Sequence, residues 1–191
     1  MSAAEDKELI WIPQGTRELL KTRILTVNEQ KCVSPKGETG DFVVIDSRDF
    51  AIVVPVLTTN PEQFVMVRQW RQGTQSLSIE FPGGVFNPGE TPEQAARREL
   101  QEETGCIAGT LVPLGTLKAN PAIMSNTAHI FAAFDLTDTK KRHLDNDEYV
   151  SVLIQDAQTV YRGFGSAPEY QHALMAAVLW LYGQRYSPNT P

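Results

Sequence analysis

Three glutamates, Glu99, Glu102 and Glu103, lie within about one turn of a predicted helix. With about 3.6 residues per turn, their side chains share an arc of roughly 100°. Like charges at this spacing repel one another, so the arrangement costs stability unless a positive charge lies on the same face. Hard divalent cations that prefer oxygen ligands, Mg²⁺ above all, suit such a face. The spacing indicates a metal site, and the alternative is a solvated face whose glutamates pair with Arg97 and Arg98.

The flanking sequence predicts the elements that hold these carboxylates. Thr91 and Gln94 have the spacing of a capping box, which begins a helix. Gly105 supplies the left-handed residue with which a helix commonly ends. The run 82–90 is rich in glycine, so its backbone can approach a phosphate or a metal closely. We therefore expect a strand over 76–81, then a glycine-rich loop, then the helix.

Residues 84–106 fit the pattern of the Nudix box, so the chain resembles a Nudix hydrolase. The positions that carry the fit are Gly84, Glu90, Arg98, Glu99, Leu100, Glu102, Glu103 and Gly105. The last box position holds Cys106 instead of an aliphatic residue, and cysteine packs as a small hydrophobe. The pattern of strands and helices alone favours an α+β fold or an α/β sandwich. The resemblance implies the second: an α/β/α sandwich with a mixed sheet, plus an N-terminal β-rich extension.

The resemblance also implies metal-assisted hydrolysis of a pyrophosphate bond. Glu99, Glu103 and the Gly83 carbonyl would hold Mg²⁺, with Mn²⁺ as a substitute, and Glu102 would complete the metal shell or pair with Arg98. Such ions offset charge in the transition state and acidify a bound water.

Arg98 and Glu102 are therefore catalytic candidates, and Glu148 is a third. Glu148 ends the acidic segment 145–148, which resembles the loop from which relatives draw a catalytic glutamate. The alternative for this segment is a solvated turn. Glu90 would be an outer metal ligand or a structural partner of the glycine-rich loop.

Three features outside the box resemble the ADP-ribose pyrophosphatases. The segments 67–71 (VRQWR) and 80–84 (EFPGG) look like two motifs of that subfamily, and Pro121 lies fifteen residues beyond Cys106, at its marker position. The resemblance implies ADP-ribose as substrate, with AMP and ribose 5-phosphate as products. Ala122 stands where many of these enzymes have glycine, so GDP-mannose or another nucleotide sugar stays open, as does nucleoside triphosphate house-cleaning. A different class of function, a non-catalytic Nudix module that senses a nucleotide sugar, usually lacks box carboxylates that are all present here.

The substrate-binding candidates are Arg71, Trp70, Pro121 and Gly84. A guanidinium matches a diphosphate with two hydrogen bonds, so Arg71 suits that role, although a surface salt bridge is the alternative. Trp70 could stack a base, but we expect an aromatic beside a core strand to pack. His129 lies in an apolar strand, where we expect a core histidine with satisfied hydrogen bonds.

Composition and sequence pattern limit the possible partners and the cellular location of the chain. The net charge of −6 argues against a nucleic-acid partner, because that affinity rests on clustered Lys and Arg. Cys32 and Cys106 form no metal-binding pair, and the first ten residues lack the order of a signal peptide. No apolar stretch is long enough to span a bilayer. We expect a cytoplasmic protein without a membrane partner.

The chain divides into three predicted parts: an extension over 1–40, a Nudix domain over 41–186 and a tail over 187–191. The extension is rich in large apolar side chains, so we expect it to form a homodimer contact. Its alternative is an extra small sheet on its own subunit. Expected strands cover 41–45, 51–57, 64–69, 76–81, 110–117, 128–136 and 149–153. A second capping box, at 166–169, predicts a helix that runs to about residue 182.

Overall fold

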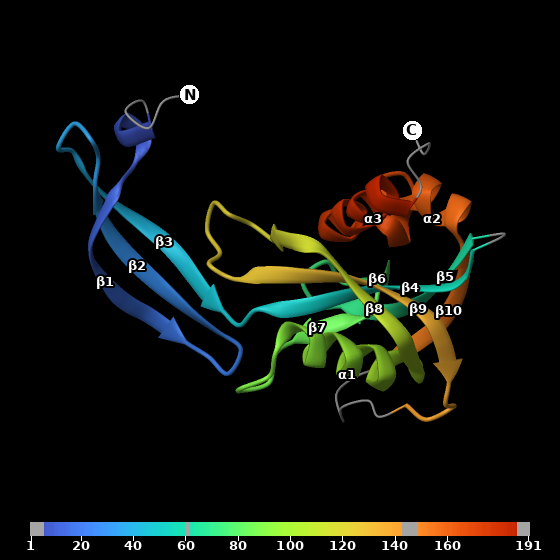
Figure 1. The fold of residues 1–191 in the computed structure, drawn as a ribbon. Coiled ribbons are helices and arrows are strands. Elements are labelled where there is room, and N and C mark those ends of the chain that lie inside the picture. Colours follow the sequence, from blue (N-terminus) through green and yellow to red (C-terminus); the bar gives the residue numbers. More distant parts are fainter. Residues whose placement is uncertain (1–5, 60–61, 143–148, 187–191) are drawn as a thin grey trace. The chain divides into compact units, whose positions relative to one another are not determined.

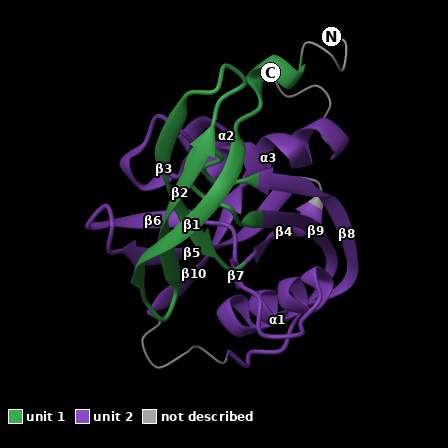
Figure 2. Cartoon of the chain, turned by 90° about the vertical axis from the view of Figure 1, so that its left-hand side faces the viewer, with its two compact units in different colours: residues 1–48, 118–127 green, residues 49–117, 128–191 purple. Residues whose placement is uncertain are grey.

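The computed structural model describes residues 6–59, 62–142 and 149–186. The chain divides into two compact units, residues 1–48 with 118–127 and residues 49–117 with 128–191 (Figure 2). Every residue of the Nudix box lies in the second unit. No helix within the described ranges is long and apolar enough to cross a membrane.

The first unit is built on a three-stranded antiparallel sheet (Figure 1). After a 3₁₀ turn η1 (Asp6–Leu9), its strands are β1 (Ile12–Lys21), β2 (Leu25–Val33) and β3 (Thr39–Ser47), in that order across the sheet. The N-terminal β-rich region is thus present. The strand expected over 41–45 is β3, and it pairs with β2 along its whole length.

Segment 118–127 joins this unit through β3. The Ile45 amide donates to the Ile123 carbonyl at 2.7 Å, and the Ser125 amide donates to the Ile45 carbonyl at 3.1 Å. Pro121 lies in a turn of this segment. The candidate Pro121 is therefore held on a loop that hydrogen bonds to the N-terminal sheet.

The second unit contains a seven-stranded mixed sheet. The main path runs β10-β5-β4-β9-β8, while β6 pairs with β5 and β7 pairs with β4. Strands β4 and β9 are parallel, and β5 is antiparallel to β4, β6 and β10. The strands are β4 (Phe50–Thr59), β5 (Glu62–Arg71), β6 (Ser76–Glu80), β7 (Gly83–Val85), β8 (Cys106–Lys118), β9 (Thr127–Asp138) and β10 (Val150–Asp156).

Alternation along β4 explains why both faces of this sheet are covered. Successive side chains of a strand point to opposite faces. Ile52 and Val54 enter an apolar core with the C-terminal helices, whereas Ala51 and Val53 enter a second core with α1 (Pro92–Thr104). Figure 1 shows α1 on one face of the sheet and α2 (Ala157–Gly163) and α3 (Ala173–Tyr186) on the other. The expected α/β/α sandwich is confirmed.

Helix α1 has the predicted ends. Thr91 is its N-cap, the capping box with Gln94 is formed, and Gly105 ends the helix with a φ of 79°. The seven expected strands correspond to β3, β4, β5, β6, β8, β9 and β10.

The helix expected from 166 to about 182 is wrong at its start. The Ser166 hydroxyl donates backward, to the carbonyls of Arg162 and Gly163 at the end of α2, so it does not cap a following helix. Glu169 accepts hydrogen bonds from Arg68 instead of closing a capping box. A 3₁₀ turn η2 (Pro168–Tyr170) forms there, and α3 begins only at Ala173.

Candidate active site

Helix α1 buries two of the three clustered glutamates. The helix is held against the sheet by apolar side chains, among them Ala96 and Leu100, which are fully buried. Glu99 is 8% exposed and Glu103 is 3% exposed, while Glu102 is only partly covered. An ionised carboxylate is costly to bury unless hydrogen bonds or positive charge compensate it. The structure must therefore supply partners for this face.

The glycine-rich loop supplies the first partner. The Gly83 amide donates to Oε2 of Glu103 at 2.9 Å. A Cβ built on Gly84 would lie 2.4 Å from Oε1 of Glu99, and one built on Gly83 would lie 2.2 Å from the Ala51 carbonyl oxygen. Gly84 thus leaves room for the Glu99 carboxylate, and Gly83 lets the loop approach the backbone of β4 while its amide binds Glu103. This arrangement brings four predicted site residues together.

Arg98 supplies the positive charge. Its Nη1 donates to Glu99 at 2.7 Å and to Glu102 at 2.8 Å, and its Nη2 donates to the Val85 carbonyl at 3.0 Å. Its Nε and Nη2 bind Glu90 at 2.8 and 2.9 Å. The hydrogen bonds that Arg98 donates to Glu90, and then those to Glu102 and Glu99, raise the pKa of Arg98 although burial opposes them. Glu102 thus pairs with Arg98, which is one of the two roles expected for it.

Glu90 is a structural partner of the loop. Besides binding Arg98, its Oε2 accepts the Asn87 amide at 2.8 Å. The hydrogen bonds from Arg98 hold the pKa of Glu90 below its usual value against a smaller opposing effect of burial. The loop before α1 is therefore tied to the helix through one carboxylate and one guanidinium.

The donor set suits a hard cation. Within the described ranges, no three His, Cys, Asp or Glu side chains lie together as a ready metal site. Glu99 and Glu103 nevertheless place two buried carboxylates beside a backbone that approaches without any Cβ. Mg²⁺ is usually held by one or two carboxylates while water and substrate phosphates complete its shell. Glu99 and Glu103 could hold such an ion.

A second charged pair, Arg71 with Glu80, lies on the β5–β6 hairpin. Arg71 binds Glu80 through two parallel hydrogen bonds, Nε to Oε1 at 2.8 Å and Nη2 to Oε2 at 2.5 Å. The Glu80 side chain is 1% exposed, whereas that of Arg71 is 43% exposed. Burial acts to raise the pKa of Glu80, but the hydrogen bonds and charge of Arg71 outweigh it and lower the pKa. The partner of Arg71 is thus a buried carboxylate.

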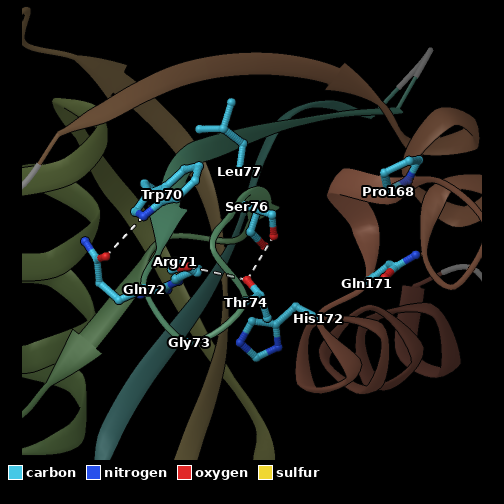
Figure 3. Close-up of a pocket in the computed structure, with 11 residues that line it drawn as sticks. Trp70, Arg71, Gln72, Gly73, Thr74, Ser76, Leu77, Pro168, Gln171 and His172 are labelled. Atoms are coloured by element: carbon cyan, nitrogen blue, oxygen red, sulfur yellow. Dashed lines mark hydrogen bonds between the residues drawn. The ribbon is translucent and has the colours of Figure 1, made fainter.

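Trp70 borders a cavity of about 750 Å³ between this hairpin and residues 168–172 (Figure 3). Its indole is 48% exposed, and Nε1 donates to Oε1 of Gln72 at 3.1 Å. The expectation that Trp70 packs in the core is therefore wrong. The opposite wall of the cavity includes Gln171 and His172, which sequence reasoning did not select.

The remaining candidates lie elsewhere or outside the description. Glu148 and the rest of segment 145–148 fall outside the described residues. Nε2 of His129 lies 3.5 Å from Oδ2 of Asp49, and its ring lies 5.2 Å from that of Phe86. Sequence reasoning did not select Glu80 by itself, although it begins the segment 80–84. Residues 76–81 (SLSIEF) alternate polar and apolar side chains, and Glu80 occupies a polar position, so no local signal marks it as buried.

The chain is similar to several known proteins. The chain is 27% identical to the ADP-ribose pyrophosphatase of Bacillus subtilis over 80% of both chains. It is 28% identical to the mouse ADP-sugar pyrophosphatase over 85% of this chain and 73% of that one. A crystal structure of an ADP compounds hydrolase has the same fold, with a TM-score of 0.82 and 22% identity over 93% of this chain and 95% of that chain.

The family itself is established by the domain that surrounds the buried glutamates. The sequence profile of the NUDIX domain matches residues 49–161, which is more than half of the chain and contains the whole of the glycine-rich loop and α1. The chain therefore belongs to the NUDIX domain family and is a Nudix hydrolase.

Proposed function

We propose that this Nudix hydrolase cleaves the pyrophosphate bond of a nucleoside diphosphate linked to a sugar, with ADP-ribose as substrate and AMP and ribose 5-phosphate as products. The observation that carries the proposal is the pair of buried carboxylates, Glu99 and Glu103, against the Gly83–Gly84 backbone. The choice of ADP-ribose is supported by relatives named for ADP-ribose and ADP-sugar.

The metal in this proposal is Mg²⁺. Glu99, Glu103 and the Gly83 carbonyl would hold it, with Glu102 as a further ligand. A bound Mg²⁺ supplies charge that offsets the phosphates and lowers the pKa of a bound water. The all-oxygen donor set of this face supports the assignment.

Protein groups supply the rest of the chemistry. Arg98 holds Glu99 and Glu102 in place, and through Glu90 it fixes the loop against the helix. Arg71 would bind the diphosphate, because its guanidinium is oriented by the buried carboxylate of Glu80 and its side chain is 43% exposed. Glu148 is our candidate for the group that orients or deprotonates the attacking water.

We also propose that the chain functions as a homodimer through its N-terminal sheet. Large apolar side chains of this unit are exposed over a continuous stretch of sequence. They are Leu9, Ile10, Trp11, Ile12, Leu19, Leu20 and Ile24. Soluble chains seldom leave so many such side chains in water, and paired subunits commonly cover them.

The proposal is tested by incubating the full chain with ADP-ribose, with and without Mg²⁺, and by separating the products. We expect AMP and ribose 5-phosphate to form together, and only with the metal. Release of free phosphate or of adenine would contradict the proposed bond cleavage. A faster reaction with GDP-mannose would keep the chemistry and overturn the substrate.

A further inference from the structure

The cavity between the β5–β6 hairpin and residues 168–172 has the size of a ligand site. Its volume of about 750 Å³ is within the range of pockets that hold a nucleotide-sized molecule. Figure 3 shows Trp70 and Leu77 on the hairpin side and Pro168 and Gln171 on the facing side. The two walls come from segments about one hundred residues apart, and both belong to the same unit.

The facing wall is fixed to the sheet. Arg68 of β5 binds the Glu169 carboxylate, with Nε to Oε1 at 3.0 Å, and so ties the 3₁₀ turn η2 to the strand that carries Trp70. Tyr170 is buried, and its ring packs on that of Phe164 at 5.3 Å. Gln171 follows directly and begins the approach to α3. Its position relative to the hairpin is therefore set by one ion pair and one packed ring.

The charge of the lining suits an uncharged ligand group. None of the described residues around this cavity is an aspartate or glutamate, and Arg71 is the one lysine or arginine among them. Because Arg71 is paired with Glu80, most of its charge is already compensated. Phosphates would gain little from the deeper part of the cavity, whereas a base or a sugar would meet neutral hydrogen-bonding groups and apolar surface.

Trp70 favours a base over a sugar. Its one polar atom, Nε1, is occupied by Gln72, so the exposed indole offers an apolar face and not a donor. Leu77 pairs with Trp70 across the hairpin and is 37% exposed, which extends the apolar surface. Aromatic side chains that are half-exposed beside a groove are the usual stacking platforms for nucleic-acid bases.

Gln171 could form hydrogen bonds with the edge of a base that stacks on Trp70. Its side chain is exposed and forms no hydrogen bond with the described part of the chain. A glutamine amide carries both a donor and an acceptor, the combination that matches the N6 and N7 edge of adenine. His172 lies beside it on the same wall and adds an imidazole, which can donate or accept.

Arg71, which lines the cavity, is bound to a residue close in sequence to the Gly83–Gly84 loop. The Arg71 guanidinium is fixed at Glu80, and Glu80 precedes Gly83 by three residues, a span of at most about 10 Å. A diphosphate reaching from the Gly83–Gly84 loop toward Arg71 would direct an attached nucleoside into the cavity.

We infer that this cavity binds the nucleoside end of the substrate, with a purine stacked on Trp70 and its edge read by Gln171 and His172. The inference rests on the proposed function for the presence of a nucleotide. It assigns base recognition to the β5–β6 hairpin and to the segment before α3.

The first test uses product binding, so it does not depend on hydrolysis. AMP and ribose 5-phosphate are titrated separately, without metal, while tryptophan fluorescence and heat are recorded. We expect AMP to quench the wild type and the Trp180→Phe variant, and to leave Trp70→Phe almost unquenched. Trp180 is the matched control, because it is 59% exposed on α3 and is not part of the cavity lining.

Two results would overturn the inference. AMP that binds by calorimetry without quenching Trp70 would place the base elsewhere, and quenching by ribose 5-phosphate alone would assign the cavity to the sugar. A wild type that fails to cleave ADP-ribose but shows AMP quenching of Trp70 would reject the proposed substrate and keep the base site.

The second test concerns specificity. In Gln171→Ala we expect the KM for ADP-ribose to rise about tenfold with kcat unchanged, since one base contact is lost without disturbing the chemistry. Gln184→Ala, an exposed glutamine of α3, is the matched control and should keep the wild-type KM. Equal KM values for the two variants would remove Gln171 from the site.

Discussion

The carboxylate of Glu99 fills the space that a side chain at Gly84 would need, since a Cβ built there would lie 2.4 Å from Oε1. Loop and helix are therefore in direct contact at the point where both carry residues of the Nudix box. The neighbouring Gly83 meets a different obstacle, because its added Cβ would lie 2.2 Å from the Ala51 carbonyl oxygen and 2.9 Å from the Ile52 Cα. Gly84 therefore leaves room for the Glu99 side chain, and Gly83 leaves room for the backbone of β4.

Substitution of the two glycines should separate activity from folding. In Gly84→Ala the Glu99 side chain can move aside, so we expect a loss of about 1–3 kcal/mol in stability. Activity should fall about 100-fold, because a carboxylate is displaced by about an ångström. In Gly83→Ala the backbone of β4 must move, so the loss of stability should exceed about 3 kcal/mol. Denaturant unfolding and steady-state rates would show both effects, and a Gly84→Ala enzyme with wild-type activity would contradict the role of Glu99.

Loss of one buried charge should stop hydrolysis and spare the fold. In Glu103→Gln the side chain keeps an oxygen for the Gly83 amide, while repulsion within the cluster falls. We expect the melting temperature in metal-free buffer to hold or rise and Mg²⁺-dependent activity to fall by orders of magnitude. Glu93→Gln is the control, because Glu93 is exposed and pairs with Arg97. Unchanged turnover in Glu103→Gln would exclude this carboxylate as a metal ligand.

The Arg71–Glu80 pair should give a measurable pH dependence. The pKa of Glu80 in the folded state is below its ordinary value of 4.5, so the ionised group stabilises the fold above that pH. This stabilisation is lost as the pH falls through the folded-state pKa. At neutral pH we expect Glu80→Gln to be less stable by about 3 kcal/mol, since one partner of a buried pair is removed. Unfolding free energies measured at a series of pH values should show the two proteins converging in acid, and a constant difference would contradict the assignment.

Much of this fold is encoded locally. The strands β4, β5 and β9 carry runs of apolar residues that are buried on both faces, and such runs predict strands without reference to the rest of the chain. Helix α1 was predicted to its ends because the Thr91 capping box and Gly105 are local signals. The cluster of glutamates was also visible, since helical spacing alone places them on one face.

What could not be predicted depends on contacts across the fold. Ser166 resembles an N-cap in sequence, but its hydroxyl is used by carbonyls of α2, a helix too short to leave a clear pattern. That Arg98 binds Glu90 as well as Glu99 and Glu102 depends on how the loop packs against α1. That Arg71 binds Glu80 depends on the pairing of β5 with β6, which carry these two residues. Gln171 likewise gains its place in the cavity only through η2, which the Arg68 ion pair holds.

The N-terminal sheet should carry the dimer contact. Every residue of β1 is exposed, and its two large adjacent apolar side chains, Leu19 and Leu20, are 45% and 56% exposed. Replacing both by glutamate should convert a dimer into a monomer, because four charges would be buried in each interface. Ile154→Glu is the control, since Ile154 is 58% exposed in the second unit. Light scattering decides the matter, and a monomeric wild type at micromolar concentration would refute the dimer.

The most direct test of the whole account is the ratio of kcat/KM for ADP-ribose to that for nucleoside triphosphates, measured at equal Mg²⁺ concentration with the full chain. The buried carboxylates predict metal-dependent cleavage, and the proposed substrate, ADP-ribose, would extend from them toward Arg71 and the cavity that Arg71 lines. We expect ADP-ribose to have a higher kcat/KM than every triphosphate and to yield AMP with ribose 5-phosphate. A higher kcat/KM for any triphosphate would contradict the account of the substrate.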